Sequence, residues 1–193
     1  MTTFTTFDRD GLPLGDTRHG DGALAALGQL GIEAGRFERP VNGAVSSTPM
    51  LTHARTLLGL QSRYDAVMTD HVRQRPWRGS GPFPPAADSR LSWPEPEHEH
   101  SHDDVELRLV LDGRLRCLLR LPTGYAAAVF EAGTWFALPP GLVHAAQAPA
   151  DTGVDLLRLF SHPHGWVVKA TGAVLPRQLL HWPAMRAPLA LAA

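Results

Sequence analysis

Short apolar runs fill the second half of the chain, and Gly, Pro or Asp separates each run from the next. Runs of this kind at close spacing are typical of the strands of an all-β sandwich or barrel. We therefore predict an all-β core with flanking helices, whose strands lie in segments 105–113, 115–121, 125–133, 134–141, 142–147, 154–160 and 165–172.

The first half of the chain has a different pattern, in which apolar residues recur at helical spacing. Asp21 is a candidate N-cap, and Gly31 is a stop signal. The apolar positions between them are Ala23, Leu24, Leu27 and Leu30. This spacing predicts a short helix, and an extended segment, 32–39, follows it.

Proline marks the next boundaries. A second helix is expected to begin near Pro49, which suits a first helical position, and to run to about Ser62. Residues 64–72 then have the composition of a strand. Between residues 75 and 96, six prolines and two glycines exclude a regular element, which predicts a long irregular loop. This loop is either a lid over a site or a linker, and the sequence does not choose.

A length of 193 residues suits one domain that buries its core without disulfides. We divide it into an N-terminal helix and strand decoration (1–74), a Pro-rich loop (75–97), a β-barrel core (98–172) and a C-terminal tail (173–193). The tail is apolar but interrupted by Pro, as expected of a segment that packs on the domain or on a neighbouring subunit.

Charge and cysteine content narrow the classes of partner. Lys plus Arg (18) nearly balances Asp plus Glu (19), which argues against nucleic acid or an anionic membrane. The single Cys117 cannot form an internal disulfide, and the opening MTTFTTFDRD lacks the basic and apolar regions of a secretory signal. No run approaches the ~18 consecutive apolar residues of a spanning helix. We expect a cytoplasmic protein with a small-molecule partner, and the sequence leaves the oligomeric state open.

Candidate metal ligands concentrate in the stretch PEPEHEHSHDDVE, where His98, His100 and His102 alternate. Two histidines one residue apart in extended chain point to the same side, so both can reach one ion. Two registers compete: His98 and His100 with Asp104, or His100 and His102 with Glu106. Each has the form His-x-His-x-x-x-carboxylate.

The spacing of the glycines and the proline that follow favours the second register, His100 and His102 with Glu106. Glu106 is followed by six residues and then Gly113, which we interpret as a turn that ends the strand. Further along the chain, the same arrangement returns at fixed spacing with Gly133, Pro139, Gly141 and His144. This pair of segments resembles the two motifs of the cupin superfamily. The resemblance implies a double-stranded β-helix, or jelly-roll, barrel.

The set of donor atoms limits which metal ions the site can bind. Three imidazoles and one carboxylate, with room for two further ligands, suit Fe(II), Ni(II) or Mn(II), whereas a closed tetrahedral zinc site normally uses thiolates. In this register, His98 is a surface residue or a neighbour of the ligands. Arg108 shares the face of Glu106, where it either binds a substrate oxygen or forms a structural ion pair.

Longer segments resemble one family within the cupins, the acireductone dioxygenases. These segments are EHEHSHDDVELRLVLDG, LGQLGIEAGRFER, YDAVMTDHV and LLRLFSHPHGWVVKATG. The resemblance implies the metal ligands His100, His102, Glu106 and His144. It implies a substrate pocket that contains Arg108, Ala146, Phe160 and Trp166, although Trp166 is alternatively a core residue. It also implies an O2-dependent enzyme in which Fe(II) or Ni(II) holds a small substrate through two oxygens.

One position beside the metal differs from that family, whose last ligand histidine is usually followed by bulky aromatics. Here Ala145 and Ala146 follow His144, and Ala146 shares the face of His144 in an extended strand, which predicts a wider pocket. Three functions therefore stay open. They are a dioxygenase that acts on acireductone, a divergent oxygenase that acts on a small thiol or an amino acid such as cysteine, and a cupin that binds or isomerises a small molecule without O2.

Overall fold

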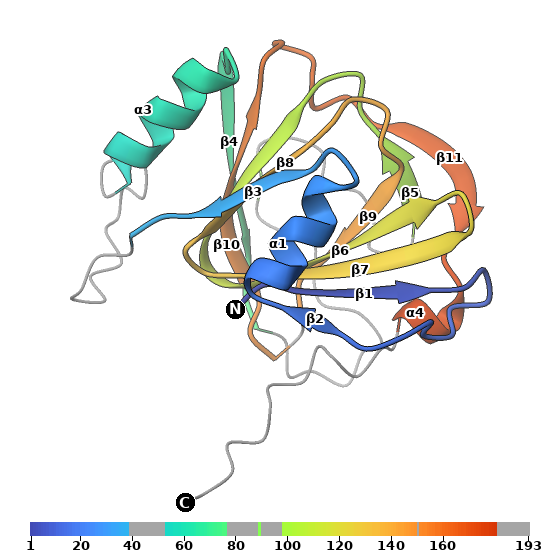
Figure 1. Ribbon diagram of the computed structural model, residues 1–193. Coiled ribbons are helices and arrows are strands. Elements are labelled where there is room, and N and C mark those ends of the chain that lie inside the picture. Colours follow the sequence, from blue (N-terminus) through green and yellow to red (C-terminus); the bar gives the residue numbers. More distant parts are fainter. Residues whose placement is uncertain (39–52, 77–88, 90–97, 150, 181–193) are drawn as a thin grey trace, which may run out of the picture.

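The computed structural model describes residues 1–38, 53–76, 89, 98–149 and 151–180. Its strands form a two-layered barrel with helices on the outside (Figure 1). The strands are β1 Thr3–Phe7, β2 Arg18–His19, β3 Glu33–Arg36, β4 Met68–Gln74, β5 His98–Ser101, β6 Glu106–Leu121, β7 Gly124–Glu131, β8 Thr134–Leu138, β9 His144–Gln147, β10 Val154–Phe160 and β11 Lys169–Val174. The helices are α1 Asp21–Gly28, α3 Ala54–Arg63 and α4 Arg177–Leu180.

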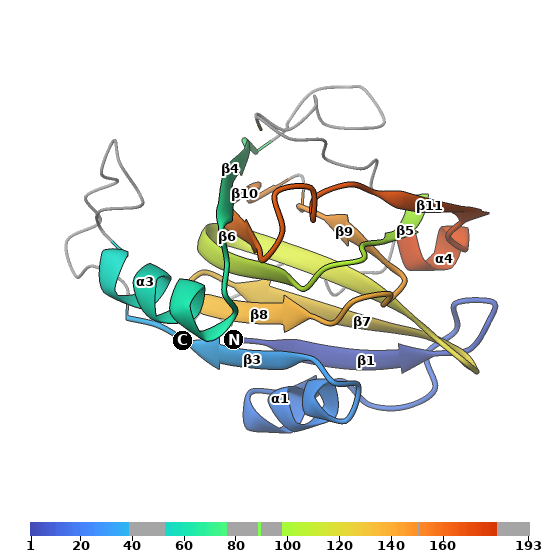
Figure 2. The ribbon, with the colours of Figure 1, turned by 90° about the horizontal axis from the view of Figure 1, so that it is seen from above.

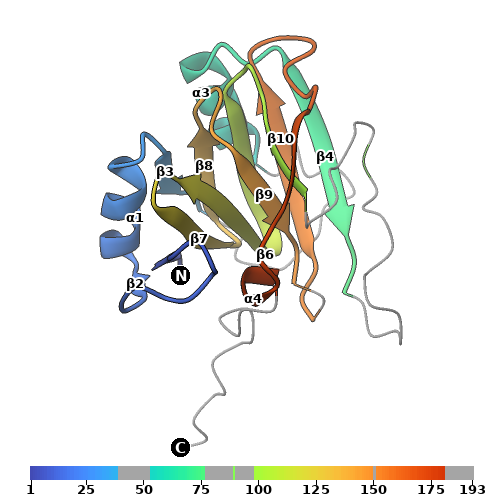
Figure 3. The same cartoon turned by 90° about the vertical axis from the view of Figure 1, so that its right-hand side faces the viewer.

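The two layers share one long strand, β6. One layer has the strand order β11-β5-β9-β6-β7-β1-β2, and the other has the order β4-β10-β6-β8-β3. Every pairing between these strands is antiparallel. Figure 3 shows the layers edge on, with β4 and β10 on one side and β7 on the other. Strands β1, β3 and β4 from the first 74 residues therefore extend both layers.

The expected strand break at Gly113 is wrong, because β6 runs from Glu106 to Leu121 without interruption. Gly113 has a φ of 70°, and a Cβ there would collide with the carbonyl group of Gly153. The ladder with β10 shifts register next to it. This bulge bends β6, so that its first half pairs with β8 and β10 and its second half with β7 and β9.

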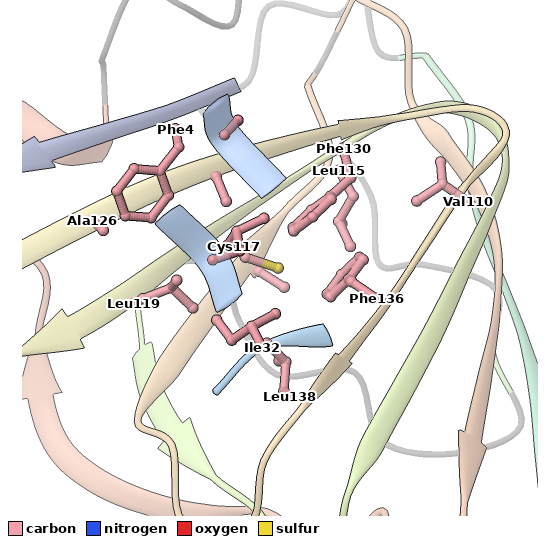
Figure 4. Packing of buried hydrophobic residues seen from close by; sticks show 14 of the residues in the cluster. Phe4, Ile32, Val110, Leu115, Cys117, Leu119, Ala126, Phe130, Phe136 and Leu138 are labelled. Atoms are coloured by element: carbon pink, nitrogen blue, oxygen red, sulfur yellow. The ribbon is translucent and has the colours of Figure 1, made fainter. Parts of the chain in front are cut away.

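A large apolar cluster lies inside the barrel. Figure 4 shows this cluster, in which the rings of Phe130 and Phe136 stack with centroids 3.7 Å apart. Cys117 lies among them, fully buried. Helix α1 adds Ala23, Ala26 and Leu27 to the same cluster and lies beside β1 and β3 (Figure 2). The apolar face predicted for this helix thus closes one side of the barrel.

Two smaller apolar clusters lie on the outer faces of the sheets. Helix α3 packs Leu57 and Leu60 on the outward side chains of β6, β8 and β10. The segment that ends in α4 packs Leu175 and Leu179 on the outward side chains of β6, β7 and β9. Both outer faces of the barrel are therefore partly covered.

Several predicted boundaries need correction. Asp21 is the first residue of α1 and Gly20 occupies the cap position, while Gly31, with a φ of 73°, lies in the turn after the helix. The predicted strand 64–72 begins later, at Met68, because Tyr64 still caps α3. The predicted start of the second helix near Pro49 lies outside the described residues, and the helix ends at Arg63, one residue beyond the expected Ser62.

The ends of the barrel also differ from expectation. The segment 165–172 begins as a turn, and β11 covers only its later part before it continues to Val174. Strand β1 was not predicted, although it pairs along its whole length with β7. Among the described residues, no helix has the length and apolar character that crossing a bilayer needs.

Candidate metal centre

Three histidines from two adjacent strands converge in the barrel. His100 in β5 lies directly opposite His144 in β9, and His102 follows β5 on the same side. One ring nitrogen of each histidine lies within 4.8 Å of one ring nitrogen of the other two. All three side chains are buried, with exposed fractions of 3% or less. The convergence follows from the alternation of side chains in β5 and from the pairing of β5 with β9.

Backbone carbonyls fix the orientation of all three imidazoles. His100 Nδ1 lies 3.3 Å from the carbonyl oxygen of His98, and His102 Nδ1 lies 3.1 Å from that of Val167. His144 Nδ1 lies 3.0 Å from the carbonyl oxygen of Leu142. Because a carbonyl only accepts, each Nδ1 carries a hydrogen, which leaves a lone pair on the Nε2 atoms of His100 and His102. Metal-binding histidines are commonly oriented in this way.

The Nε2 atoms of His100 and His102 have no hydrogen-bond partner within the described part of the chain, although both are buried. Unpartnered buried nitrogens are costly unless a ligand occupies them. Burial, followed by the charge of His144, lowers the pKa of His100 to about 3, and burial also lowers the pKa of His102. Both rings are therefore neutral at neutral pH. The residues present fit a divalent transition metal.

Glu106 lies beside two of the histidines, but it is not part of the group whose ligand atoms all lie within 4.8 Å of one another, and it has a competing partner. Its Oε2 lies 3.2 Å from His144 Nε2 and 3.8 Å from His102 Nε2. Arg108 Nη2 donates to both carboxylate oxygens, at 2.8 and 2.7 Å, and lies 3.5 Å from His144 Nε2. Burial alone would raise the pKa of Glu106, but Arg108 and the histidines hold it well below the ordinary value. Arg108 thus supplies the positive charge that this buried carboxylate requires.

The alternative ligand Asp104 lies elsewhere and has a structural role. Its carboxylate accepts hydrogen bonds from the backbone N–H groups of Val105 and His162, both at 2.8 Å, and from the hydroxyl of Ser161. Gly165 passes so close to this carboxylate that it has no room for a side chain. Asp104 therefore fixes the turn that leads to Val167, whose carbonyl orients His102.

Two other carboxylates of the histidine-rich stretch are also paired. Glu99 is buried on the outer side of β5 and forms a two-pronged ion pair with Arg120, whose Nε lies 2.9 Å from Glu99 Oε1. Asp103 pairs with Lys169 at 2.6 Å, at the exposed surface. His98, expected at the surface, is exposed. Among the described residues of this stretch, Glu99, Asp103 and Asp104 thus have partners away from the histidines.

The predicted pocket residues lie at different distances from the histidines. The Phe160 ring is buried, with its centroid 5.9 Å from that of His102. Ala146 faces inward opposite Cys117 and belongs to the inner cluster, whereas Ala145 faces outward. Trp166 is half-buried and is not part of the described core clusters.

One buried ion pair near the site was not predicted. Arg158 Nη2 lies 2.7 Å from Asp70 Oδ2, and both side chains are buried inside the barrel. Arg158 lies directly opposite Arg108 in the β6–β10 ladder, and its guanidinium lies 5.8 Å from the centroid of the Phe160 ring. The signal in the sequence was a charged residue between Leu157 and Leu159, in a run otherwise interpreted as apolar.

The barrel and its three oriented imidazoles define a metal-binding cupin, as the sequence predicted. No family model matches the chain. Acireductone dioxygenase of Methylococcus capsulatus is 27% identical over 161 residues, covering 81% of each chain. The enzyme of the same name from Pseudomonas savastanoi is 26% identical over 156 residues, covering 80% of this chain and 82% of that one.

A solved structure shows the same fold. Acireductone dioxygenase from Bacillus anthracis, with a cadmium ion in its active centre, aligns with a TM-score of 0.65 and 15% identity, over 87% of this chain and 97% of that chain. The chain is thus a divergent relative of the acireductone dioxygenases. This relationship indicates an enzyme, a metal-dependent dioxygenase.

Proposed function

We propose that the chain binds Fe(II) or Ni(II), with Mn(II) as a further candidate, through His100, His102, Glu106 and His144. We propose further that the holoprotein chelates a small substrate through two oxygens and oxidises it with O2. The observation that carries this proposal is the orientation of the imidazoles. Three Nδ1 atoms face backbone carbonyls, which leaves the Nε2 atoms to bind an ion, and one ring nitrogen of each histidine lies within 4.8 Å of the others.

A divalent ion bound there would stabilise a deprotonated enediol and gather substrate and O2 in one place. The chain's own residues then have distinct roles. Arg108 is a buried cation within hydrogen-bond reach of Glu106, and it can turn to an anionic substrate oxygen once Glu106 has another positive partner. Phe160 packs beside His102 and keeps water from that side of the ligands. Arg158 and Asp70 neutralise each other on the adjacent strands.

Metal analysis tests the ligand set directly. The wild-type protein is expected to bind one divalent ion per chain, and His144→Ala is expected to lose it, because His144 contributes one of three convergent nitrogens. His98→Ala is the matched control, since His98 is exposed. Unchanged metal content in His144→Ala would contradict the assigned site.

An oxygen electrode tests the reaction. Protein loaded with Fe(II), and separately with Ni(II), is expected to consume O2 when given an enediol such as acireductone. Arg108→Lys is expected to raise KM more than it lowers kcat if the guanidinium binds a substrate oxygen, because Lys keeps the charge but loses the planar fork. The dioxygenase proposal fails if neither metal form consumes O2 with any enediol, small thiol or amino acid.

A second substrate class is favoured by the small residues beside the ligands. Ala146 follows His144 by two positions on the inner face of β9, and it lies opposite Cys117, which in turn lies opposite Ala128. We infer from this row of small side chains, which belong to the buried inner cluster, that the substrate is a small thiol or an amino acid such as cysteine. Parallel O2-uptake assays with acireductone and cysteine distinguish the two. Ala146→Phe is expected to improve the ratio for acireductone if the wider pocket accounts for the difference.

A further inference from the structure

A second buried arginine on β6, Arg116, has no carboxylate partner in the described part of the chain. Its side chain is 0% exposed, and its Nε and Nη1 have no hydrogen-bond partner there. The remaining nitrogen, Nη2, donates to the side-chain oxygen of Gln147 and to the carbonyl oxygen of Leu180, the latter at 3.2 Å. Both of these acceptors are neutral.

Neighbouring arginines on the same strand show what is unusual about this one. Arg114 pairs with Asp151 at 3.3 Å, and Arg120 pairs with Glu99. Both of those arginines have a carboxylate partner, although their side chains are less deeply buried than that of Arg116. A buried guanidinium without a counter-charge destabilises the folded state, because the loss of hydration is not offset by an ion pair. Burial alone lowers the pKa of Arg116 to about 10, which leaves it charged at neutral pH.

We propose that Arg116 is the centre of a binding site for a small inorganic monoanion of the chloride class. The anion would accept hydrogen bonds from Nε and Nη1, the two donors without a partner. A small ion is required because the side chain is fully covered. A monoanion is required because the face shared with Leu118, Leu175 and Leu179 is apolar, and a strongly hydrated dianion would cost more to desolvate there.

The anion site would connect three elements, β6, β9 and α4, on the outer face of the sheet. Arg116 belongs to β6, Gln147 ends β9, the strand that begins with His144, and Leu180 ends α4. An anion that neutralises Arg116 would therefore stabilise the packing of α4 on the outer face of the barrel. This inference does not depend on the proposed reaction, because Arg116 and His144 lie on separate faces of their sheet.

Chloride titration of the purified, metal-loaded protein tests the site. Unfolding is followed in potassium chloride and in potassium gluconate at equal ionic strength. Chloride at about ten times its Kd is expected to raise the folding equilibrium constant about tenfold, with saturation, and bromide is expected to act in the same way. Arg116→Met is expected to lose this response. Arg114→Met is the matched control and is expected to keep it, because Arg114 already has Asp151.

Crystals of the wild-type protein grown in bromide give a test that needs no variant. An anomalous peak beside Nε and Nη1 of Arg116 is expected. The proposal is overturned if no such peak appears, if wild-type stability is the same in chloride and gluconate, or if Arg116→Met responds to chloride as the wild-type protein does. Should Arg116→Met fail to fold, the diffraction result and the wild-type comparison of chloride with gluconate decide.

Discussion

Arg108 and Arg116 lie on the same strand, and both are fully buried, yet their surroundings are opposite. Arg108 points into the barrel and pairs with Glu106, and although burial opposes its charge, Glu106 raises its pKa. Arg116 points outward beneath α4, and burial without a counter-charge lowers its pKa to about 10. Burial by itself therefore does not define the role of a charged residue in this barrel. The role depends on the partner of the charged group, and variants that change this partner test the comparison between Arg108 and Arg116.

Removing the partner of Arg108 is expected to have the largest effect. Glu106→Gln should lower metal affinity by roughly 100-fold or more, because a ligand matters at least as much as the groups that orient it. It should also cost about 3–5 kcal/mol in the metal-free protein, because Arg108 is left buried without a counter-charge. Chelator competition and urea unfolding measure the two effects.

Asp104→Asn is the control for that experiment, since it changes the alternative ligand. It is expected to loosen the turn at Ser161 and His162 while metal affinity changes far less than in Glu106→Gln. Equal losses of metal affinity in the two variants would show that the chosen register is wrong.

Replacing each arginine by methionine compares the two sites directly. In metal-free protein and chloride-free buffer, Arg108→Met should cost about 3–5 kcal/mol, because Glu106 then stays buried and unpaired. Arg116→Met should be neutral or stabilising by about 1–4 kcal/mol, because an apolar side chain of similar volume replaces an uncompensated charge. Equal destabilisation of both variants in urea unfolding would remove the distinction between the sites.

Acid affects the inner site in a predictable direction. The folded-state pKa of His100 is about 3, below its ordinary value of 6.5, so the unfolded chain binds more protons between these values. The free energy of unfolding of the metal-free protein should therefore fall as pH drops from about 6.5 towards 3, by up to about 1.4 kcal/mol per pH unit from His100.

His102 should add to this slope in the same direction, because burial lowers its pKa as well. Urea unfolding at several pH values measures the slope, and His100→Gln should reduce it. A free energy of unfolding that stays constant from pH 6.5 to 4 would contradict the neutral, buried histidines.

The smallest effects are expected at two ion pairs of the histidine-rich stretch, one on the outer side of β5 and one at the exposed surface. Glu99→Gln should cost about 1–2 kcal/mol, because it weakens the tie between β5 and β6 while Arg120, which is 42% exposed, stays solvated. Metal affinity should change only modestly. Asp103→Asn, at an exposed pair, should stay within about 0.5 kcal/mol, and thermal unfolding of both variants checks the order.

Sequence by itself predicted most of the strands, the barrel class and the three histidines. The alternation in β5 predicted that His100 and His102 share a face, and the resemblance of the two segments to the cupin motifs implied His144 as the third histidine of the group. The ligand role of Glu106 stays a prediction. Alternation suffices for His100 and His102 because neighbouring residues on one strand face can share an ion, whereas His144 reaches them only through the pairing of β9 with β5.

Tertiary structure decided which residues pair and which way β6 faces. The bulge near Gly113 shifts the inward positions from Glu106 and Arg108 to Leu115 and Cys117, and Arg116 therefore turns outward. One extra residue in a strand exchanges its two faces, and nothing in the local pattern records the exchange. Glu99, Asp104 and Asp70 likewise have partners that lie far away in the sequence, at separations of 21, 58 and 88 residues. They were decided only when the chain folded, because contacts between distant segments depend on how the sheets are placed.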